Sequence, residues 1–348
     1  MQKTTLNNTH LLFLLLVLQH IFELMSKRNL SIDLIKVLAM FSVLALHSFG
    51  ARMEWGLANI FYESAVIGIP LFFMVSGYLL IGKQTVDIKY VCNKICNILR
   101  LIFILSIICW IFMSIESGQF YINYFIWIFK GAFIQNGPLW ICWYLASMII
   151  IYSLLPIVNK LLVFQSYWYT LLFLGVIEVF VFWQNIRNLG EQNIIQTFRL
   201  WNWLFYFLLG GGIKRLHMNI NLSFVKILII FLLIMNVFFQ EVMKAMINSP
   251  YCEYFYCSVS VILLSALVFL YFTNIKLTNF YICRFVKFIS PLFLPIYLFH
   301  PLFLDVHTIL PMAESIKPFA CFVVTTILSV SFCFCLNKVG FIRKRLRI

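Results

Sequence analysis

The stretch Asn29–Phe49, NLSIDLIKVLAMFSVLALHSF, has the length and the apolar content of a membrane-spanning helix. Three ionisable residues interrupt it, namely Asp33, Lys36 and His47. An α-helix turns by about 100° per residue, so Lys36 and His47 fall within about 20° of each other and Asp33 lies about 40° from that line. All three side chains therefore share one stripe of the predicted helix, and about 16 Å of helix axis separates Lys36 from His47.

This polar stripe has a functional and a structural interpretation. Ionisable side chains are costly inside a membrane, so they face the interior of a helix bundle and commonly belong to functional sites. A lysine that reaches toward the headgroups and a histidine bonded to a neighbouring helix explain Lys36 and His47 without a function. Asp33 can pair with Lys36 three residues later, or it can simply be a carboxylate favoured by the positive end of the helix dipole.

The composition predicts a polytopic membrane protein with an all-α fold. Apolar residues make up 63% of the chain and charged residues 11%, whereas soluble domains carry about 25% charged residues. The mean hydropathy is +0.97. Repeated long apolar runs predict one helical bundle of about ten transmembrane helices. The predicted spans cover residues 32–50, 60–82, 95–115, 138–157, 166–184, 197–213, 222–243, 255–273, 284–304 and 316–336.

The basic residues predict topology rather than nucleic-acid binding. The net charge is +14, but the charges lie in short loops between the predicted spans, where Lys and Arg set orientation. With alternating spans, most of the 26 Lys and Arg residues fall on the side of both termini, which are therefore predicted to be cytoplasmic. The outer side receives only Arg52, Lys130, Arg187, Arg199, Lys244 and Lys317.

Both ends of the chain differ from the bundle. Residues 1–24 contain an apolar run too short to span a membrane, and we expect them to be an extension that precedes a native start at Met25, or an interfacial helix. Residues 338–348 are predicted to be a basic cytoplasmic tail. The aromatic segment 116–137 is predicted to lie at the membrane interface. The ten cysteines show no metal-binding spacing, so no metal site is expected.

Two motifs give the chain a resemblance to a known family. The segment 28–36 followed by His47 is similar to the pattern R/KNxxIDxxK with a histidine eleven residues after the lysine. Residues 68–78, GIPLFFMVSGY, match GxPLFFxxSGY. Weaker matches are LWxxWYL at Leu139–Leu145 and IYLFH at Ile296–His300. Together these motifs resemble the acyltransferase 3 family of bacterial integral-membrane proteins, over residues 27–337.

The resemblance implies an enzyme. Members of this family O-acylate sugars and other cell-surface molecules, and their donor is acyl-coenzyme A, most often acetyl-coenzyme A, supplied from the cytoplasm. We therefore expect residues 27–337 to form a membrane acyltransferase domain in the bacterial inner membrane. Its acceptor would be a hydroxyl of an envelope glycan or lipid-linked sugar, and its partners would be the bilayer and both substrates. No bound cofactor and no nucleic acid are expected.

The resemblance also suggests roles for the polar stripe. Acyl transfer to a hydroxyl needs a base, and histidine accepts and returns protons near neutral pH, so His47 is the candidate general base. Lys36, held by Asp33, would anchor the phosphates of the donor. Lys94 and Arg100 would add phosphate contacts. The family often carries an RxxR pair in this loop, whereas here the sequence reads Lys94-Ile95-Cys96-Asn97, without the second basic residue.

Further candidates keep two interpretations each. Ser76 and Gly77 are explained by a donor-channel wall or by close helix packing. Glu178, a carboxylate in a predicted span, would orient His47 or contact the acceptor, if it is functional. Trp140 and Tyr144 would stack on a sugar or belong to an aromatic belt at the membrane surface. His300 is either a structural histidine or a second functional one.

Two other functions use the same features. A transporter or flippase for a polar or polyprenyl-linked substrate would use the polar stripe as its pathway. An inactive partner of a polysaccharide synthase would not need His47.

Overall fold

The computed structural model describes residues 29–83, 86–161, 164–187, 194–216, 220–305 and 312–338, so the predicted extension over 1–24 and the tail beyond residue 338 lie outside the described residues. All regular structure in the described part is helical. The elements are α2 (Leu30–Phe49), α3 (Leu57–Ser64), η1 (Ala65–Ile67), α4 (Gly68–Leu80), α5 (Ile88–Ser117), α6 (Ile122–Ile134), η2 (Gly137–Cys142), α7 (Trp143–Leu161), α8 (Phe164–Ile186), η4 (Gln196–Phe198), α9 (Leu200–Leu216), α10 (Leu222–Ile247), η5 (Cys252–Phe255), α11 (Val259–Asn274), α12 (Phe280–Ile289), η6 (Ser290–Leu292), α13 (Phe293–Phe299), η7 (His300–Phe303) and α14 (Lys317–Lys338).

The all-helical membrane fold is confirmed. Each predicted span coincides with a helix or a run of consecutive helices. Within the described residues, eight helical runs are long and apolar enough to cross a membrane, and α11 is apolar but shorter, with 16 residues. The count of ten spans and the cytoplasmic position of the termini stay predictions. The segment predicted to lie at the interface contains α6.

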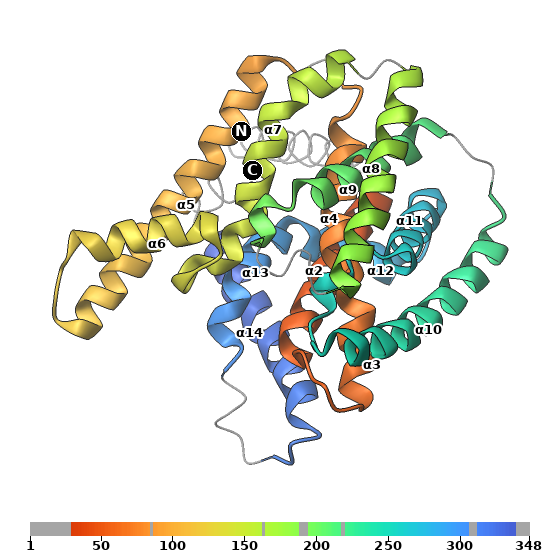
Figure 1. Cartoon of the computed structure of the whole chain (residues 1–348). Coiled ribbons are helices and arrows are strands. Elements are labelled where there is room, and N and C mark those ends of the chain that lie inside the picture. The colour runs from red at the N-terminus through yellow and green to blue at the C-terminus, as the bar shows by residue number, and fades with distance from the viewer. Residues whose placement is uncertain are drawn as a thin grey trace, which may run out of the picture.

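Helix α4 lies between α2 and α9 in the middle of the bundle (Figure 1). Glycines allow these close approaches. A side chain at Gly77 would overlap the backbone carbonyl of Phe207 in α9, and one at Gly210 would overlap that of Met74 in α4. A Cβ at Gly68 would lie 2.8 Å from the Cβ of Ser42 in α2. Small residues are the usual means by which membrane helices bring their backbones together.

Local signals define both ends of α2. The side chain of Asn29 caps the helix by accepting hydrogen bonds from the backbone N–H groups of Ser31 and Ile32, at 3.1 and 3.2 Å. Such a cap satisfies amides that have no partner within the helix. Gly50 ends the helix with φ of 66°, a conformation that glycine adopts at little cost. Helices α4, α11, α12, α13 and α14 pack around α2.

The run from residue 280 to 303 is interrupted by prolines. Pro291 lies in η6, and Pro301 lies in η7 directly after His300. Proline lacks the backbone N–H and cannot continue a regular helix, so the segment is divided into α12, η6, α13 and η7. The short helix α13 packs against α2, and this places Tyr297 and His300 in the bundle interior, with exposures of 1% and 0%.

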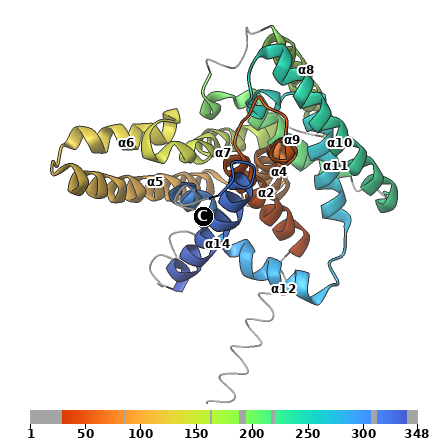
Figure 2. The same ribbon diagram turned by 90° about the horizontal axis from the view of Figure 1, so that it is seen from below.

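Helices α5 and α6 lie side by side and project from the rest of the bundle as an arm (Figures 1 and 2). Asp87 caps α5 by accepting a hydrogen bond from the backbone N–H of Tyr90 at 2.7 Å. Gly118 ends the helix with φ of 68°. The first turns of α5 stay near α4 and α7 and therefore contribute to the site described next.

Candidate active site

Two histidines that are far apart in the sequence stack on each other. The ring of His47, in the last turn of α2, lies 5.3 Å from the ring of His300, with 24° between the planes. Trp140 of η2 contacts His47 edge-on, with ring centroids 5.1 Å apart. Three separate elements thus converge on the predicted base.

The hydrogen bond of His300 determines which of its ring nitrogens carries the proton. Its Nδ1 lies 2.7 Å from the backbone carbonyl oxygen of Tyr297. A carbonyl can only accept, so Nδ1 carries the hydrogen and donates it. In the neutral ring, Nε2 therefore holds the free lone pair. This atom is buried and has no hydrogen-bond partner within the described part of the chain.

A cavity of about 390 Å³ lies at the other end of the polar stripe. Three lysines from different elements line it, Lys36 of α2, Lys83 after α4 and Lys94 of α5. The remaining lining is mostly apolar and aromatic and consists of Phe72, Val75, Ser76, Leu79, Leu80, Tyr90, Ile98, Tyr144, Leu145, Met148, Tyr152, Phe293 and Leu294. Such a lining suits a ligand with an anionic end and an apolar arm.

The charge in this cavity is only partly compensated. Lys36 Nζ lies 3.2 Å from Asp33 Oδ1, the pair that the helical spacing predicts. Lys83 and Lys94 instead lie over the ring of Tyr90, at 5.1 and 5.8 Å from its centroid. Neither forms a salt bridge in the described residues. The ring stabilises both ammonium groups, but positive charge remains for an anion to neutralise.

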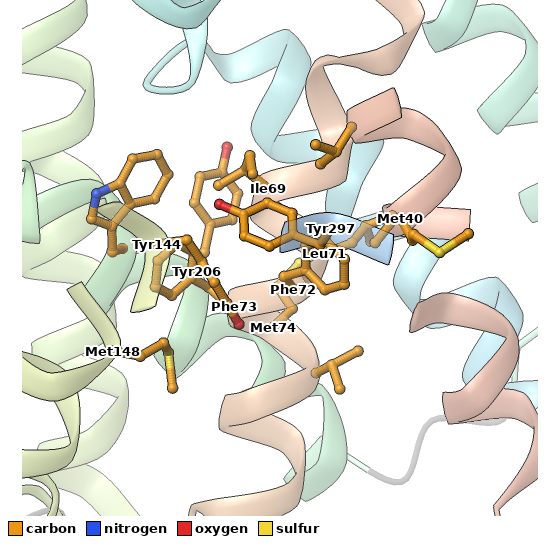
Figure 3. Packing of buried hydrophobic residues seen from close by; sticks show 14 of the residues in the cluster. Met40, Ile69, Leu71, Phe72, Phe73, Met74, Tyr144, Met148, Tyr206 and Tyr297 are labelled. Atoms are coloured by element: carbon orange, nitrogen blue, oxygen red, sulfur yellow. The ribbon is translucent and has the colours of Figure 1, made fainter. Parts of the chain in front are cut away.

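A layer of aromatic rings separates the cavity from the histidines. Phe72 and Tyr144 line the cavity, and their ring centroids are 5.7 Å apart. The ring of Tyr297 lies next to both, with centroids 6.1 Å from Phe72 and 5.7 Å from Tyr144 (Figure 3). The ring of His300 lies 6.2 Å from that of Tyr297. The hydroxyl of Tyr297 donates a hydrogen bond of 2.6 Å to the carbonyl oxygen of Ile141. The lysine cavity is therefore linked to the histidine pair by a continuous series of aromatic contacts, from Tyr144 to Tyr297 and from Tyr297 to His300.

Comparison of the sequence with known proteins identifies the family of the chain. A family model described as an acyltransferase domain matches residues 29–338, nearly the whole chain. The chain belongs to this acyltransferase family. Among curated proteins, an amino-acid racemase of Enterococcus faecalis is 26% identical over 132 residues, which are 36% of this chain and 19% of the length of that protein. No solved structure matches the chain.

The resemblance drawn from the motifs is thus confirmed: the chain belongs to an acyltransferase family, and eight helical runs in its described part are long and apolar enough to cross a membrane. The roles of individual residues stay predictions, but the structure brings several of them together. Lys36, Ser76, Lys94 and Tyr144 line one cavity, with the Oγ of Ser76 donating a hydrogen bond of 3.1 Å to the carbonyl oxygen of Phe72. Asp33 holds Lys36, while Trp140 and His300 contact His47.

Three of the predicted site residues lie outside the cavity and the histidine pair. Gly77 packs on α9 and does not line the cavity. Arg100 is exposed, and its position six residues after Lys94 turns it about 120° away on α5. Glu178 is buried in α8, which packs mainly on α9, α10 and η5. The roles suggested for them in donor or acceptor binding stay predictions.

Some residues of the site carried no recognisable signal in the sequence. Lys83, Tyr90 and Tyr152 line the cavity, although nothing in their sequence surroundings marks them as site residues. The sequence likewise gives no sign of the buried ion pair between Glu63 and Lys244. Lys244, expected in an outer loop, lies within α10 with its side chain 2% exposed.

Proposed function

We propose that this acyltransferase moves an acyl group, most often acetyl, from cytoplasmic acyl-coenzyme A to a hydroxyl of an envelope glycan or lipid-linked sugar. The observation that carries the proposal is the series of ring contacts that links the His47–His300 pair, through Tyr297 and Tyr144, to the cavity lined by three lysines. The lysine cavity suits a polyanion, and the histidine pair suits proton transfer. A transferase for a phosphate-bearing donor needs both.

The donor would enter with its phosphates on the lysines. Lysine binds phosphate as a point charge, and three of them line the cavity. The apolar part of the lining, with Phe72, Tyr144 and Phe293, would accommodate the uncharged arm that carries the thioester. The volume of about 390 Å³ is within the usual range of small-molecule sites.

His47 would act as the general base. It removes the proton from the acceptor hydroxyl while the oxygen attacks the thioester carbonyl. The new C–O bond forms, the C–S bond breaks, and the protonated imidazole returns its proton to the leaving thiolate, so that the ester and free coenzyme A result. His300 keeps its Nδ1–H on the carbonyl oxygen of Tyr297 and remains neutral, because two charged rings 5.3 Å apart would repel each other.

Replacement of the base tests the proposal. In cells that carry the wild type, His47→Ala or an empty vector, the acylation of envelope glycans is measured, together with coenzyme A binding to the purified proteins. His47→Ala should lower acyl transfer by about 10²- to 10⁴-fold, with donor binding retained. Lys226→Gln, a change of an exposed lysine in α10 outside the cavity, is the matched control and should transfer as the wild type does.

Two results would contradict the proposal. Acylation by His47→Ala at the wild-type level removes His47 from the mechanism while leaving the family assignment intact. A wild type that neither binds coenzyme A nor forms an acylated product would indicate the transporter function instead.

A further inference from the structure

A second hollow adjoins the lysine cavity. It has a volume of about 660 Å³ and lies between the start of α5 and the end of α7. Lys83 lines both spaces and therefore connects them. The other lining residues are Gly82, Val86, Asp87, Ile88, Lys89, Pro156, Asn159 and Lys160.

The hollow has an excess of positive charge. Lys83, Lys89 and Lys160 are exposed lysines that form no salt bridge in the described residues. Asp87 is the single carboxylate in the lining, and its Oδ1 is used as the cap of α5, where it accepts from the N–H of Tyr90. Nothing else in the lining neutralises the three ammonium groups.

The helix dipole favours the position of one of these lysines but disfavours that of another. Lys160 is in the last turn of α7, where a cation is favoured by the dipole. Lys89 is the second residue of α5, at the positive end of that helix, where a cation is disfavoured. Its position becomes favourable when an anion binds to both the helix end and the ammonium group.

Asn159 supplies a second, independent indication. Its Oδ1 accepts a hydrogen bond from the backbone N–H of Gly82 at 3.4 Å. Its Nδ2 is buried and has no hydrogen-bond partner among the described residues. A buried donor without an acceptor is costly, and this one belongs to a residue that lines the hollow. A ligand oxygen would satisfy it.

We propose that this hollow binds the phosphate-bearing nucleotide end of the donor, with Lys89, Asn159 and Lys160 as its contacts and Lys83 as the bridge to the cavity. The inference rests on the proposed function. Coenzyme A carries a diphosphate and a separate 3′-phosphate, so it needs two anion positions joined by a continuous path. The shared Lys83 provides that continuity. The phosphate of a lipid headgroup has the same chemistry and is the alternative source.

The test compares three ligands on the purified full chain in nanodiscs of neutral lipid. Coenzyme A, 3′-dephospho-coenzyme A and pantetheine, which has no phosphate, are titrated against the wild type, the double variant Lys89→Gln/Lys160→Gln and the control Lys226→Gln. We expect the double variant to bind coenzyme A about 9- to 25-fold more weakly, because each of the two lost ammonium–phosphate pairs weakens binding by roughly three- to fivefold. Its affinity for pantetheine should not change, nor should any affinity of the control.

The ligand series separates the possible failures. A double variant that binds coenzyme A as tightly as the wild type overturns the inference. A double variant that loses affinity for coenzyme A and pantetheine equally also overturns it, because the loss then does not depend on the phosphates. Retention of phosphatidylglycerol is measured separately, in nanodiscs that contain this anionic lipid. A variant that retains less of the lipid but binds coenzyme A as the wild type does would make the hollow a headgroup site and overturn the inference. If the wild type does not bind coenzyme A, the proposed function fails first and the assignment of the hollow fails with it.

Discussion

Replacement of Lys244 by methionine should destabilise the protein strongly. The ammonium group lies 2.6 Å from Glu63 Oε1 and 2.6 Å from Glu241 Oε1. The side chains of Lys244 and Glu63 are 2% and 0% exposed, so water cannot replace the lost partner. Lys244 also donates a hydrogen bond of 3.3 Å to the carbonyl oxygen of Arg52, in the loop that follows α2. This buried cluster therefore joins α3, α10 and that loop.

The expected magnitude follows from the burial. Removal of one member of a buried ion pair leaves an uncompensated charge and costs about 3–5 kcal/mol. Lys244→Met retains most of the side-chain volume, so the loss of stability results from the removed charge rather than from a cavity. In thermal unfolding in detergent, the midpoint should fall by roughly 5 to 15 °C. The double variant Glu63→Gln/Lys244→Met removes both charges and should recover more than half of the loss, since Glu241 remains 20% exposed and keeps a hydrogen bond from Asn59 at 3.0 Å.

An exposed pair provides the control. Lys317 pairs with Glu314, whose side chain is 85% exposed, at the same helical spacing as Glu241 and Lys244. Lys317→Met should change the free energy of unfolding by no more than about 1 kcal/mol. The reasoning is refuted if Lys244→Met unfolds within about 2 °C of the wild type, or if the double variant is no more stable than the single one.

Three further outcomes are expected. Lys36→Ala should weaken coenzyme A binding about tenfold. Lys36→Arg should weaken it only slightly, because arginine retains the positive charge that faces the cavity. If a titration shows that both variants lose the same affinity, the charge has no role. Gly77→Ala should lower the folded yield and cost about 1–3 kcal/mol or more, since the new methyl group would overlap the carbonyl of Phe207, and a normal thermal midpoint would contradict the packing. Reporter fusions after Lys338 should indicate the cytoplasm and fusions near Glu314 the outer side, whereas a cytoplasmic signal at Glu314 would reject the ten-span topology.

Much of the fold was predictable because membrane helices leave a direct mark on composition. The span predicted over 32–50 is the helix Leu30–Phe49, and its ends are set by signals that the sequence carries, the cap Asn29 and Gly50. The span predicted over 284–304 is interrupted by 3-10 turns at Pro291 and Pro301. Average hydropathy reports whether a segment prefers lipid, but it does not report where the backbone hydrogen bonds are interrupted.

The site was predictable only in part, because it is assembled from distant segments. Helical geometry places Asp33 and Lys36 together, and the structure has them paired. The contact of His47 with His300 depends on how α13 packs against α2, which no local pattern determines. Lys83 likewise joins the cavity through the position of the loop after α4, and its sequence surroundings do not distinguish it from other loop lysines.

The length of α5 has a consequence for the surrounding bilayer. Its 30 residues give an axis of about 45 Å, longer than the roughly 30 Å of hydrocarbon. The helix must tilt steeply, thicken the lipid next to it, or let one end stand among the headgroups. The arm that it forms with α6 leans away from the bundle (Figure 2). Lys89 and Lys94 are in its first turns. A change in bilayer thickness therefore acts on the same helix that holds the proposed phosphate contacts, and acyl transfer should depend on the acyl-chain length of the host lipid.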